Sequence, residues 1–338
     1  MTKPLVAVGS LGGTITMTSE TGTGVKPTLA AADLIAAIPA LAATATLRPA
    51  TLAALPGASL VSGDVLGALT WARDAVVDGA DGAVLVQGTD TLEETAYLLD
   101  LFWDRAEPLV VTGAMRSPQR AGSDGPANLL AAVTVAAAPR SRHLGVLTVL
   151  NDEIHAAARV CKTHSMALDA FSSPSFGPVG RLVEGLPVYG NRPPRQPPLP
   201  LPPESAQDAR VALLTAHLDD TGDLLRLVVD ADYDGAVIAA FGAGHVSASL
   251  AEAVSKATER LPVVFASRTG SGPTARNTYG FVGSESDLIS RGAVAAGWLT
   301  PVKARLLLWA LLRLGCSPGC VEAEFARRGV SPWGPEDR

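Results

Sequence analysis

The chain has few of the residues that build metal centres and disulfide frameworks. It contains only 3 cysteines and 5 histidines among 338 residues, and they are too scattered for a zinc cluster. We therefore predict no metal site. Cys316 and Cys320 stand four residues apart without a second ligand pair, so we interpret them as ordinary thiols. An odd number of cysteines suits a reducing compartment.

Blocks of basic residues and long apolar runs are also missing. The formal net charge is −6 and no Lys/Arg-rich block occurs, which argues against a nucleic-acid partner. No run of about 20 apolar residues appears, so no membrane span is expected. Residues 1–4 lead directly into the apolar run Leu5 to Val8, without the pattern of a secretory leader. We expect a cytoplasmic protein.

What the chain does contain is an alternation of short apolar runs with helical segments. Alternation of this kind predicts an α/β fold with right-handed crossovers and a parallel sheet. Strands are expected at 5–11, 83–86, 109–112, 144–150, 211–214, 236–240 and 263–266, and helices at 29–41, 65–77, 92–103, 126–138, 224–229, 248–257 and 302–314. A dense proline run at 191–203 reads as a stiff linker, with peptide docking as the weaker interpretation.

These elements predict two domains. A larger N-terminal parallel-sheet domain with flanking helices spans residues 1–190, followed by a proline-rich linker at 191–208. A smaller C-terminal α/β domain spans 209–338.

Two threonine-containing turns follow apolar runs. They read Gly12-Gly13-Thr14-Ile15 and Gly88-Thr89-Asp90-Thr91, and Thr91 with Glu94 forms a capping-box pattern at the start of the next helix. Because ligands bind beyond the carboxyl ends of parallel strands, these turns predict one edge of a pocket. Taken alone, each glycine motif is better explained by a tight turn than by a ligand site. Neither G-x-G-x-x-G nor a Walker A pattern occurs, so phosphate binding is the weaker interpretation.

Together with Lys162, these segments resemble the bacterial-type L-asparaginase family. The resemblance continues through 113–116, 124–129, 151–154 and 162–163 and reaches 299–305, in the same order along almost the whole chain. It implies an amidohydrolase that converts L-asparagine to L-aspartate and ammonia with no cofactor. It also implies a homodimer or homotetramer with sites completed at the subunit interface.

The resemblance assigns the chemistry to a few positions. Thr14 is the nucleophile that forms an acyl-enzyme, and Thr89, Asp90 and Lys162 form a hydrogen-bonded set in which neutral Lys162 takes a proton. The Thr89 N–H, at a helix start, can stabilise the developing oxyanion. The residues expected to bind substrate are Gly13, Ser59, Gly88, Thr89, Asp90, Ala114, His245 and Glu285.

Four departures from the family pattern leave points open. Residues 16–27, the expected mobile loop, contain no tyrosine to contact Thr14, and Tyr279 is a distant substitute. Gln87 replaces a histidine, which predicts altered hydrogen bonding without loss of activity. The substrate carboxylate is held either by Ser59 or, with a small shift in alignment, by the backbone at Gly57. His245, in place of an asparagine, either tunes pH dependence or makes a structural hydrogen bond.

Three other functions remain as alternatives. A glutaminase-asparaginase differs only in pocket size, and one methylene is discriminated by roughly 10–200-fold. The amidase partner of a tRNA-dependent amidotransferase is disfavoured because an N-terminal extension and a basic surface are missing. A non-catalytic amino-acid-binding relative is favoured by the missing tyrosine and opposed by the retained Thr14, Thr89, Asp90 and Lys162.

Overall fold

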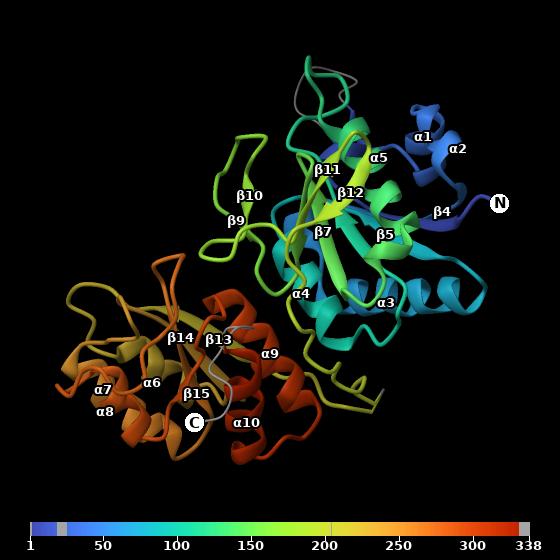
Figure 1. The fold of residues 1–338 in the computed structure, drawn as a ribbon. Helices are drawn as coiled ribbons and strands as arrows, with labels where there is room; N and C mark the ends of the chain where they lie inside the picture. The colour runs from blue at the N-terminus through green and yellow to red at the C-terminus, as the bar shows by residue number, and fades with distance from the viewer. Residues whose placement is uncertain (1, 19–25, 204, 331–338) are drawn as a thin grey trace. The chain divides into compact units, whose positions relative to one another are not determined.

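The chain forms two compact units, residues Met1–Pro198 and Leu199–Arg338 (Figure 1). The computed structural model describes residues 2–18, 26–203 and 205–330. The two units divide inside the segment expected to be a linker. Its described residues from 191 to 203 carry neither helix nor strand, as the proline content predicts.

Unit 1 is built on an eight-stranded sheet in the order β12-β11-β8-β7-β6-β5-β1-β4. Its strands are β1 (Leu5–Gly12), β4 (Thr46–Leu55), β5 (Gly82–Val86), β6 (Leu109–Thr112), β7 (Val146–Leu150), β8 (Glu153–Ala156), β11 (Gly180–Val183) and β12 (Leu186–Tyr189). Two short pairs lie outside it: β2 (Met17–Thr18) with β3 (Lys26–Pro27), and β9 (Cys161–Lys162) with β10 (Phe171–Ser172).

The large sheet is mixed, which corrects the predicted parallel sheet. Strands β4, β1, β5, β6 and β7 run parallel, whereas β8, β11 and β12 continue the sheet antiparallel. The reason lies in two tight turns. Asn151 and Asp152 both have positive φ and connect Leu150 of β7 to its partner Glu153 of β8. Glu184 and Gly185 also have positive φ, and they connect Val183 of β11 to its partner Leu186 of β12. Such two-residue turns reverse the chain without a crossover helix.

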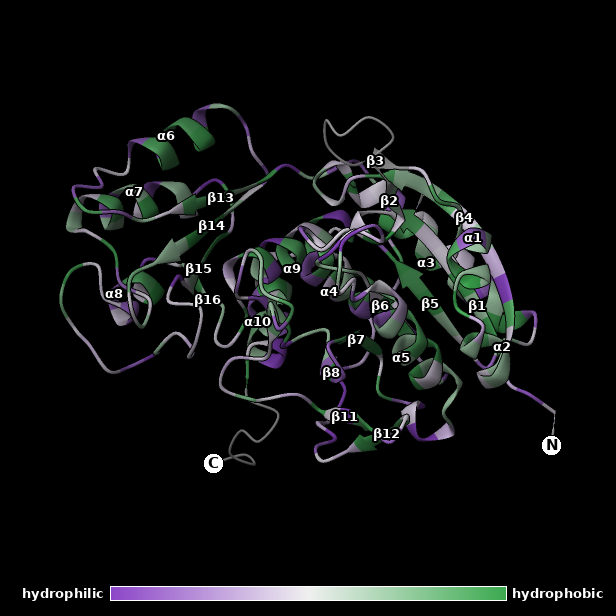
Figure 2. Ribbon diagram, turned by 90° about the horizontal axis from the view of Figure 1, so that it is seen from above, coloured by the Kyte–Doolittle hydropathy of each residue, from purple (hydrophilic) through white to green (hydrophobic). Residues whose placement is uncertain are grey.

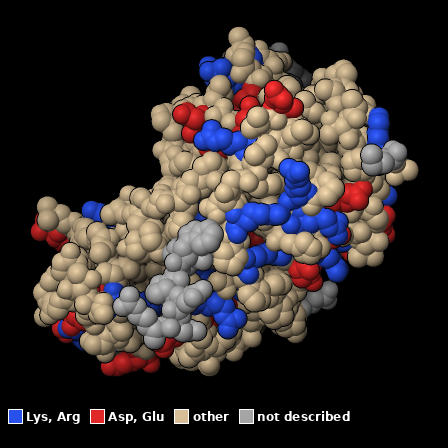
Figure 3. Space-filling model, viewed as in Figure 1, with Lys and Arg blue, Asp and Glu red and all other residues tan. Residues whose placement is uncertain are grey.

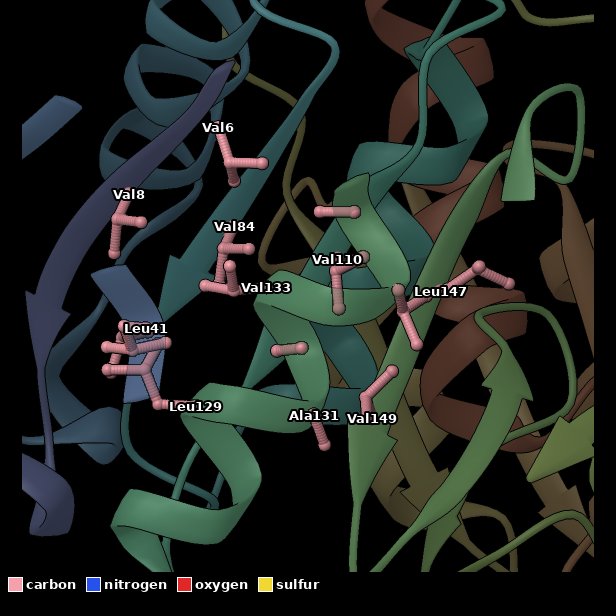
Figure 4. Packing of buried hydrophobic residues seen from close by; sticks show 14 of the residues in the cluster. Val6, Val8, Leu41, Val84, Val110, Leu129, Ala131, Val133, Leu147 and Val149 are labelled. Carbon is pink, nitrogen blue, oxygen red and sulfur yellow. The ribbon is translucent and has the colours of Figure 1, made fainter. Parts of the chain in front are cut away.

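Helices cover both faces of the parallel part. They are α1 (Ala31–Ala36), α2 (Ala40–Thr44), α3 (Ser62–Val77), α4 (Leu92–Phe102) and α5 (Gly125–Ala137), with 3-10 turns η1 (Thr14–Thr16), η2 (Gly57–Ser59) and η3 (Pro139–Ser141). The core below α5 joins strand and helix side chains such as Val84, Val110 and Leu129 (Figure 4). Strand β5 is hydrophobic throughout, as expected between two helical layers (Figure 2).

Two local predictions in unit 1 were wrong. The helix expected over 29–41 is divided into α1 and α2, because Pro39 cannot continue a helix and instead precedes α2. Strand β4 was missed. It carries Pro49 and lies at the sheet edge with mostly exposed or half-buried side chains, which is where a sheet tolerates proline.

Unit 2 has a four-stranded parallel sheet in the order β13-β14-β15-β16. Its elements are β13 (Val211–Thr215), α6 (Asp223–Asp230), β14 (Gly235–Ala240), α7 (Ala248–Thr258), β15 (Val263–Ser267), α8 (Glu285–Ser290), β16 (Val294–Ala295), α9 (Pro301–Arg313) and α10 (Pro318–Arg328). The predicted α/β class is therefore confirmed for both units, although α8, α10 and β16 were missed.

A disulfide joins Cys316 to Cys320, where we predicted free thiols. The turn into α10 brings their Cα atoms to 5.5 Å, a separation that a disulfide spans. Cys161 is free. Across the described residues, no helix has the length and apolarity needed to span a membrane.

Basic side chains gather on the face of unit 1 seen in Figure 3, among scattered acidic ones. Several arginines of this unit pair with carboxylates, including Arg142 with Glu107 at 2.6 Å and Arg73 with Asp104 at 3.2 Å. Pairing of this kind offsets the local positive charge. The absence of a nucleic-acid partner stays a prediction.

Candidate active site

Three glycines from separate loops meet at the carboxyl ends of the parallel strands. A Cβ added to Gly13 would lie 2.0 Å from the Gly88 nitrogen, and one added to Gly88 would lie 2.7 Å from the Gly57 nitrogen. Gly13 also has φ of +86°, which favours glycine. These glycines therefore do more than turn the chain, because they allow three backbones to touch. We call residues 13, 57 and 88 the glycine junction.

Thr14 and Thr89 leave this junction directly. Thr14 begins η1 and is half-buried, whereas Thr89 is only 5% exposed in the turn before α4. Helix α4 begins after Thr91, as predicted, but the predicted capping box is absent. The Thr91 hydroxyl instead donates to the Gly57 carbonyl oxygen at 2.9 Å, which fastens two loops of the junction together.

Lys162 reaches this turn from the short strand β9. Its Nζ donates to Thr89 Oγ1 at 2.9 Å and to Asp90 Oδ1 at 3.1 Å. The Lys162 side chain is largely buried, at 16% exposed, while the Asp90 side chain is 63% exposed. The Lys162 amine thus joins the Thr89 hydroxyl and the Asp90 carboxylate in one hydrogen-bonded set, although Lys162 follows Thr89 by 73 residues. A charged pair with an adjacent hydroxyl can move protons and hold an ionic ligand group.

A hollow of about 380 Å³ opens beside this set. It is lined by Asp90, Lys162, Thr163, His164 and Ser165. The exposed carboxylate of Asp90 therefore faces a space that a small ligand could enter.

Ala114 is fully buried in the loop after β6, and a polar network holds this loop. The Asp124 carboxylate accepts hydrogen bonds from the backbone N–H groups of Met115 and Arg116, both at 2.9 Å. Asn128 Nδ2 donates to Asp124 and to the Gly113 carbonyl oxygen, each at 3.0 Å. Asp124 and Asn128 enter the sequence analysis only within the matching segment 124–129, and their spacing of four residues at the start of α5 was the signal for this role.

The two candidates for holding the substrate carboxylate differ in position. Gly57 is buried in the glycine junction, while Ser59 is exposed at the end of η2. Gln87 is buried, and its Nε2 donates to the Gly88 carbonyl oxygen at 3.2 Å. The mobile loop expected at 16–27 includes residues 19–25, which lie outside the described residues.

His245 and Glu285 belong to unit 2 and lie together there. Glu285 is fully buried, and its Oε1 accepts from the backbone N–H groups of Thr278 and Tyr279 at 2.7 and 2.8 Å. Its Oε2 is 3.3 Å from His245 Nε2. Burial alone would raise the pKa of Glu285, but the backbone N–H donors and the nearby His245 outweigh burial and lower it.

Aromatic rings surround His245. Its ring contacts those of Tyr279 and Phe281 edge-on, with centroids at 4.6 and 5.1 Å. Both aromatic residues remain about half exposed. Tyr279, considered as a substitute for the loop tyrosine, is thus part of this unit 2 cluster. Among the described residues, no group of three or more His, Cys, Asp or Glu is placed to hold a metal ion.

Comparison with known proteins agrees with this two-part architecture. A family model described as the N-terminal part of asparaginase matches residues 5–195. A second, described as the glutaminase/asparaginase C-terminal domain, matches residues 210–325.

Curated relatives cover most of the chain. A probable L-asparaginase from Deinococcus radiodurans is 38% identical over 75% of this chain and 78% of its own. L-asparaginase 2 from Escherichia coli is 31% identical over 95% of this chain and 92% of its own. A crystal structure of a probable cytoplasmic L-asparaginase from Campylobacter jejuni has a TM-score of 0.85 at 29% identity, covering 96% of this chain and 99% of that one.

Proposed function

The chain belongs to the asparaginase family, and we propose that it is an L-asparaginase that hydrolyses L-asparagine to L-aspartate and ammonia through Thr14. The amidohydrolase activity follows from the family and from relatives at 31–38% identity. The residue roles below are our proposal for this chain.

One observation carries the proposal. Lys162 Nζ lies within hydrogen-bond distance of both Thr89 Oγ1 and Asp90 Oδ1, beside the glycine junction from which Thr14 also emerges. Proton exchange between Lys162 and Thr89 needs no large movement at a separation of 2.9 Å.

The reaction runs in two steps. The Thr14 hydroxyl oxygen attacks the side-chain amide carbon and gives its proton to the set of Lys162, Thr89 and Asp90. The set returns a proton to the amide nitrogen, the C–N bond breaks, and ammonia leaves. Water then attacks the acyl-enzyme ester, which releases aspartate and restores the Thr14 hydroxyl. A weak alcohol thus becomes an effective nucleophile because a base lies within reach.

Substrate binding is shared among the surrounding loops. The Thr89 N–H, before α4, stabilises the oxyanion, and the Ala114 carbonyl oxygen accepts from the leaving amide. Gly13 and Gly88 contact the substrate through their backbone groups at the junction, and Asp90 binds its α-amino group. Either Ser59 or the backbone at Gly57 holds the α-carboxylate.

The unit 2 residues His245 and Glu285 would complete the α-amino site of a second copy. We therefore propose a homodimer or homotetramer. The exposed apolar side chains of Tyr279, Phe281 and Val282 next to His245 support such association, because patches of this kind favour interfaces. Light scattering on the purified protein gives the oligomeric state.

We also propose a cytoplasmic location, as for the Campylobacter relative. A relative from Haemophilus influenzae is described as periplasmic, and disulfides such as Cys316–Cys320 are typical of oxidising compartments. Cell fractionation with an antibody against the protein decides between the two.

The activity test measures ammonia release from L-asparagine, L-glutamine and D-asparagine in parallel. Release from L-asparagine supports the proposal and shows that the loop tyrosine is dispensable. No release from any of the three by a folded oligomer would favour a non-catalytic binding protein.

Glutaminase activity is the second candidate. The matching C-terminal family model is described by both activities, so the family alone does not separate them. The ratio of kcat/KM values for L-asparagine and L-glutamine decides, and a ratio near one would make the enzyme a glutaminase-asparaginase.

A further inference from the structure

Lys162 is carried by a segment that leaves the large sheet of unit 1 and returns to it. At the start, the Ala157 N–H donates to the Val146 carbonyl oxygen at 3.1 Å, and at the end the Val179 N–H donates to that of Ile154 at 2.8 Å. Between these points, β9 pairs antiparallel with β10, with Lys162 opposite Phe171. The position of Lys162 therefore depends on how residues 158–178 are attached to the sheet.

A buried histidine makes one such attachment. His155 lies on β8 with no exposed surface, and its Nδ1 is 2.9 Å from the hydroxyl oxygen of Ser173. Ser173 directly follows β10 and is 4% exposed. On the other side of the ring, Nε2 is 3.3 Å from Glu153 Oε2. His155 thus connects a strand of the large sheet to the returning arm of the hairpin.

The outgoing arm is held separately. Glu93 Oε1, on the first turn of α4, accepts a hydrogen bond from the Lys162 N–H at 3.3 Å. The guanidinium of Arg159 lies 4.1 Å from the ring centroid of Phe176, which joins the outgoing arm to the returning one. Two anchors, one on α4 and one on β8, therefore define where the hairpin places Lys162.

We propose that His155 is a positioning residue for Lys162 and acts through Ser173. The inference rests on the proposed function, in which Lys162 Nζ must stay within hydrogen-bond reach of Thr89. Misplacing a reacting group by about 1 Å can cost about 10²-fold in rate, so the anchoring of β10 affects catalysis at a distance. His155 itself contacts no reacting atom.

The types of side chain suggest a second interpretation that burial excludes. A serine, a histidine and a carboxylate that contact one another in this order are the parts of a nucleophilic triad. Ser173 and His155 are both buried, so no substrate reaches the Ser173 hydroxyl. Anchoring of the hairpin is the role that this geometry supports.

Two substitutions of His155 distinguish its contact with Ser173 from its contact with Glu153. His155→Asn places an amide group near the position of Nδ1 and can keep the link to Ser173, whereas His155→Gln reaches toward Glu153 instead. We expect His155→Gln and Ser173→Ala to lower kcat about 10- to 100-fold with little change in KM, and His155→Asn to stay within about 3-fold of wild type. The double variant His155→Gln/Ser173→Ala should be no worse than either single one.

Ser141→Ala is the matched control, because the buried Ser141 hydroxyl hydrogen-bonds the Tyr189 hydroxyl at 2.6 Å elsewhere in unit 1. It should lower the melting temperature about as much as Ser173→Ala and leave kcat unchanged. Equal loss of kcat in Ser141→Ala, or equal impairment of His155→Asn and His155→Gln, would overturn the inference.

The kcat of the wild-type protein in the same assay distinguishes failure of the positioning role from failure of the proposed function. An active wild type with all His155 and Ser173 variants at its kcat overturns the positioning role alone. A wild type without turnover overturns the proposed function and this inference with it.

Discussion

Both units belong to the α/β class, but they place their charged groups in opposite ways. In unit 1 the Asp90 side chain is 63% exposed beside Lys162, so it can still take a ligand. In unit 2 the Glu285 carboxylate is fully buried and is occupied by two backbone N–H groups and His245. Parallel strands thus provide the location, while the loops decide how far each carboxylate is exposed and which groups contact it.

The largest effect is expected when the hydroxyl groups of the two site threonines in unit 1 are removed. Thr14→Ala and Thr89→Ala should each lower kcat by about 10³-fold or more, because residues that act as a unit lose most of the rate together. Steady-state ammonia release measures the effect. Thr70→Ala, which removes an exposed hydroxyl on α3, is the control and should keep wild-type kcat. Unchanged turnover in both site variants would contradict the mechanism.

The next largest loss of kcat is expected when the Lys162 amine is removed. Lys162→Met should lower kcat by about 10²- to 10⁴-fold, the usual contribution of a general acid or base. Lys256→Met removes an exposed lysine from α7 in unit 2 and should change nothing. A Lys162→Met enzyme with normal kcat would exclude this residue from proton transfer.

Two glycines with similar φ test how crowded each unit is. Gly13 has φ +86° and touches Gly88, whereas Gly270 in unit 2 has φ +80° and open space where a Cβ would lie. Gly13→Ala should lower the free energy of unfolding by about 3 kcal/mol, from strain and overpacking together. Gly270→Ala should cost only about 1 kcal/mol. Denaturant titration measures both, and equal losses would mean that the glycine junction is not tightly packed.

The smallest effect is the pH dependence due to Glu285. Its pKa is lower in the folded protein than the usual 4.5, so its stabilising contribution is complete above about pH 4.5 and is lost as the pH falls through the folded pKa. Glu285→Gln should cost about 1 kcal/mol at pH 7, because charge-assisted hydrogen bonds become neutral ones.

The difference between wild type and Glu285→Gln should shrink as the pH falls below 4.5. Melting temperatures across this range provide the measurement. Glu259→Gln, on the surface, is the control. A difference that stayed constant with pH would show that Glu285 contributes through packing and not through its charge.

Much of the fold was predictable because local patterns dominate it. The start of α4 after Thr91 and the buried strand β5 follow from residues next to each other in sequence. The antiparallel part of the large sheet, strands β8, β11 and β12, was missed, although Asn151-Asp152 and Glu184-Gly185 are turn-forming pairs. Strand β4 was missed because proline tolerance depends on the sheet edge, which a single segment does not reveal.

For the site, the sequence by itself determined which side chains stand at strand ends: Thr14, Thr89 and Asp90. Only the tertiary structure decided that Lys162, 73 residues after Thr89, contacts Thr89 and Asp90, and that Glu285 lies buried against His245. Propensities and turn signals act over a few residues. The position of Lys162 depends on a hairpin anchored to β8 and α4, whose contacts exist only once the sheet has formed.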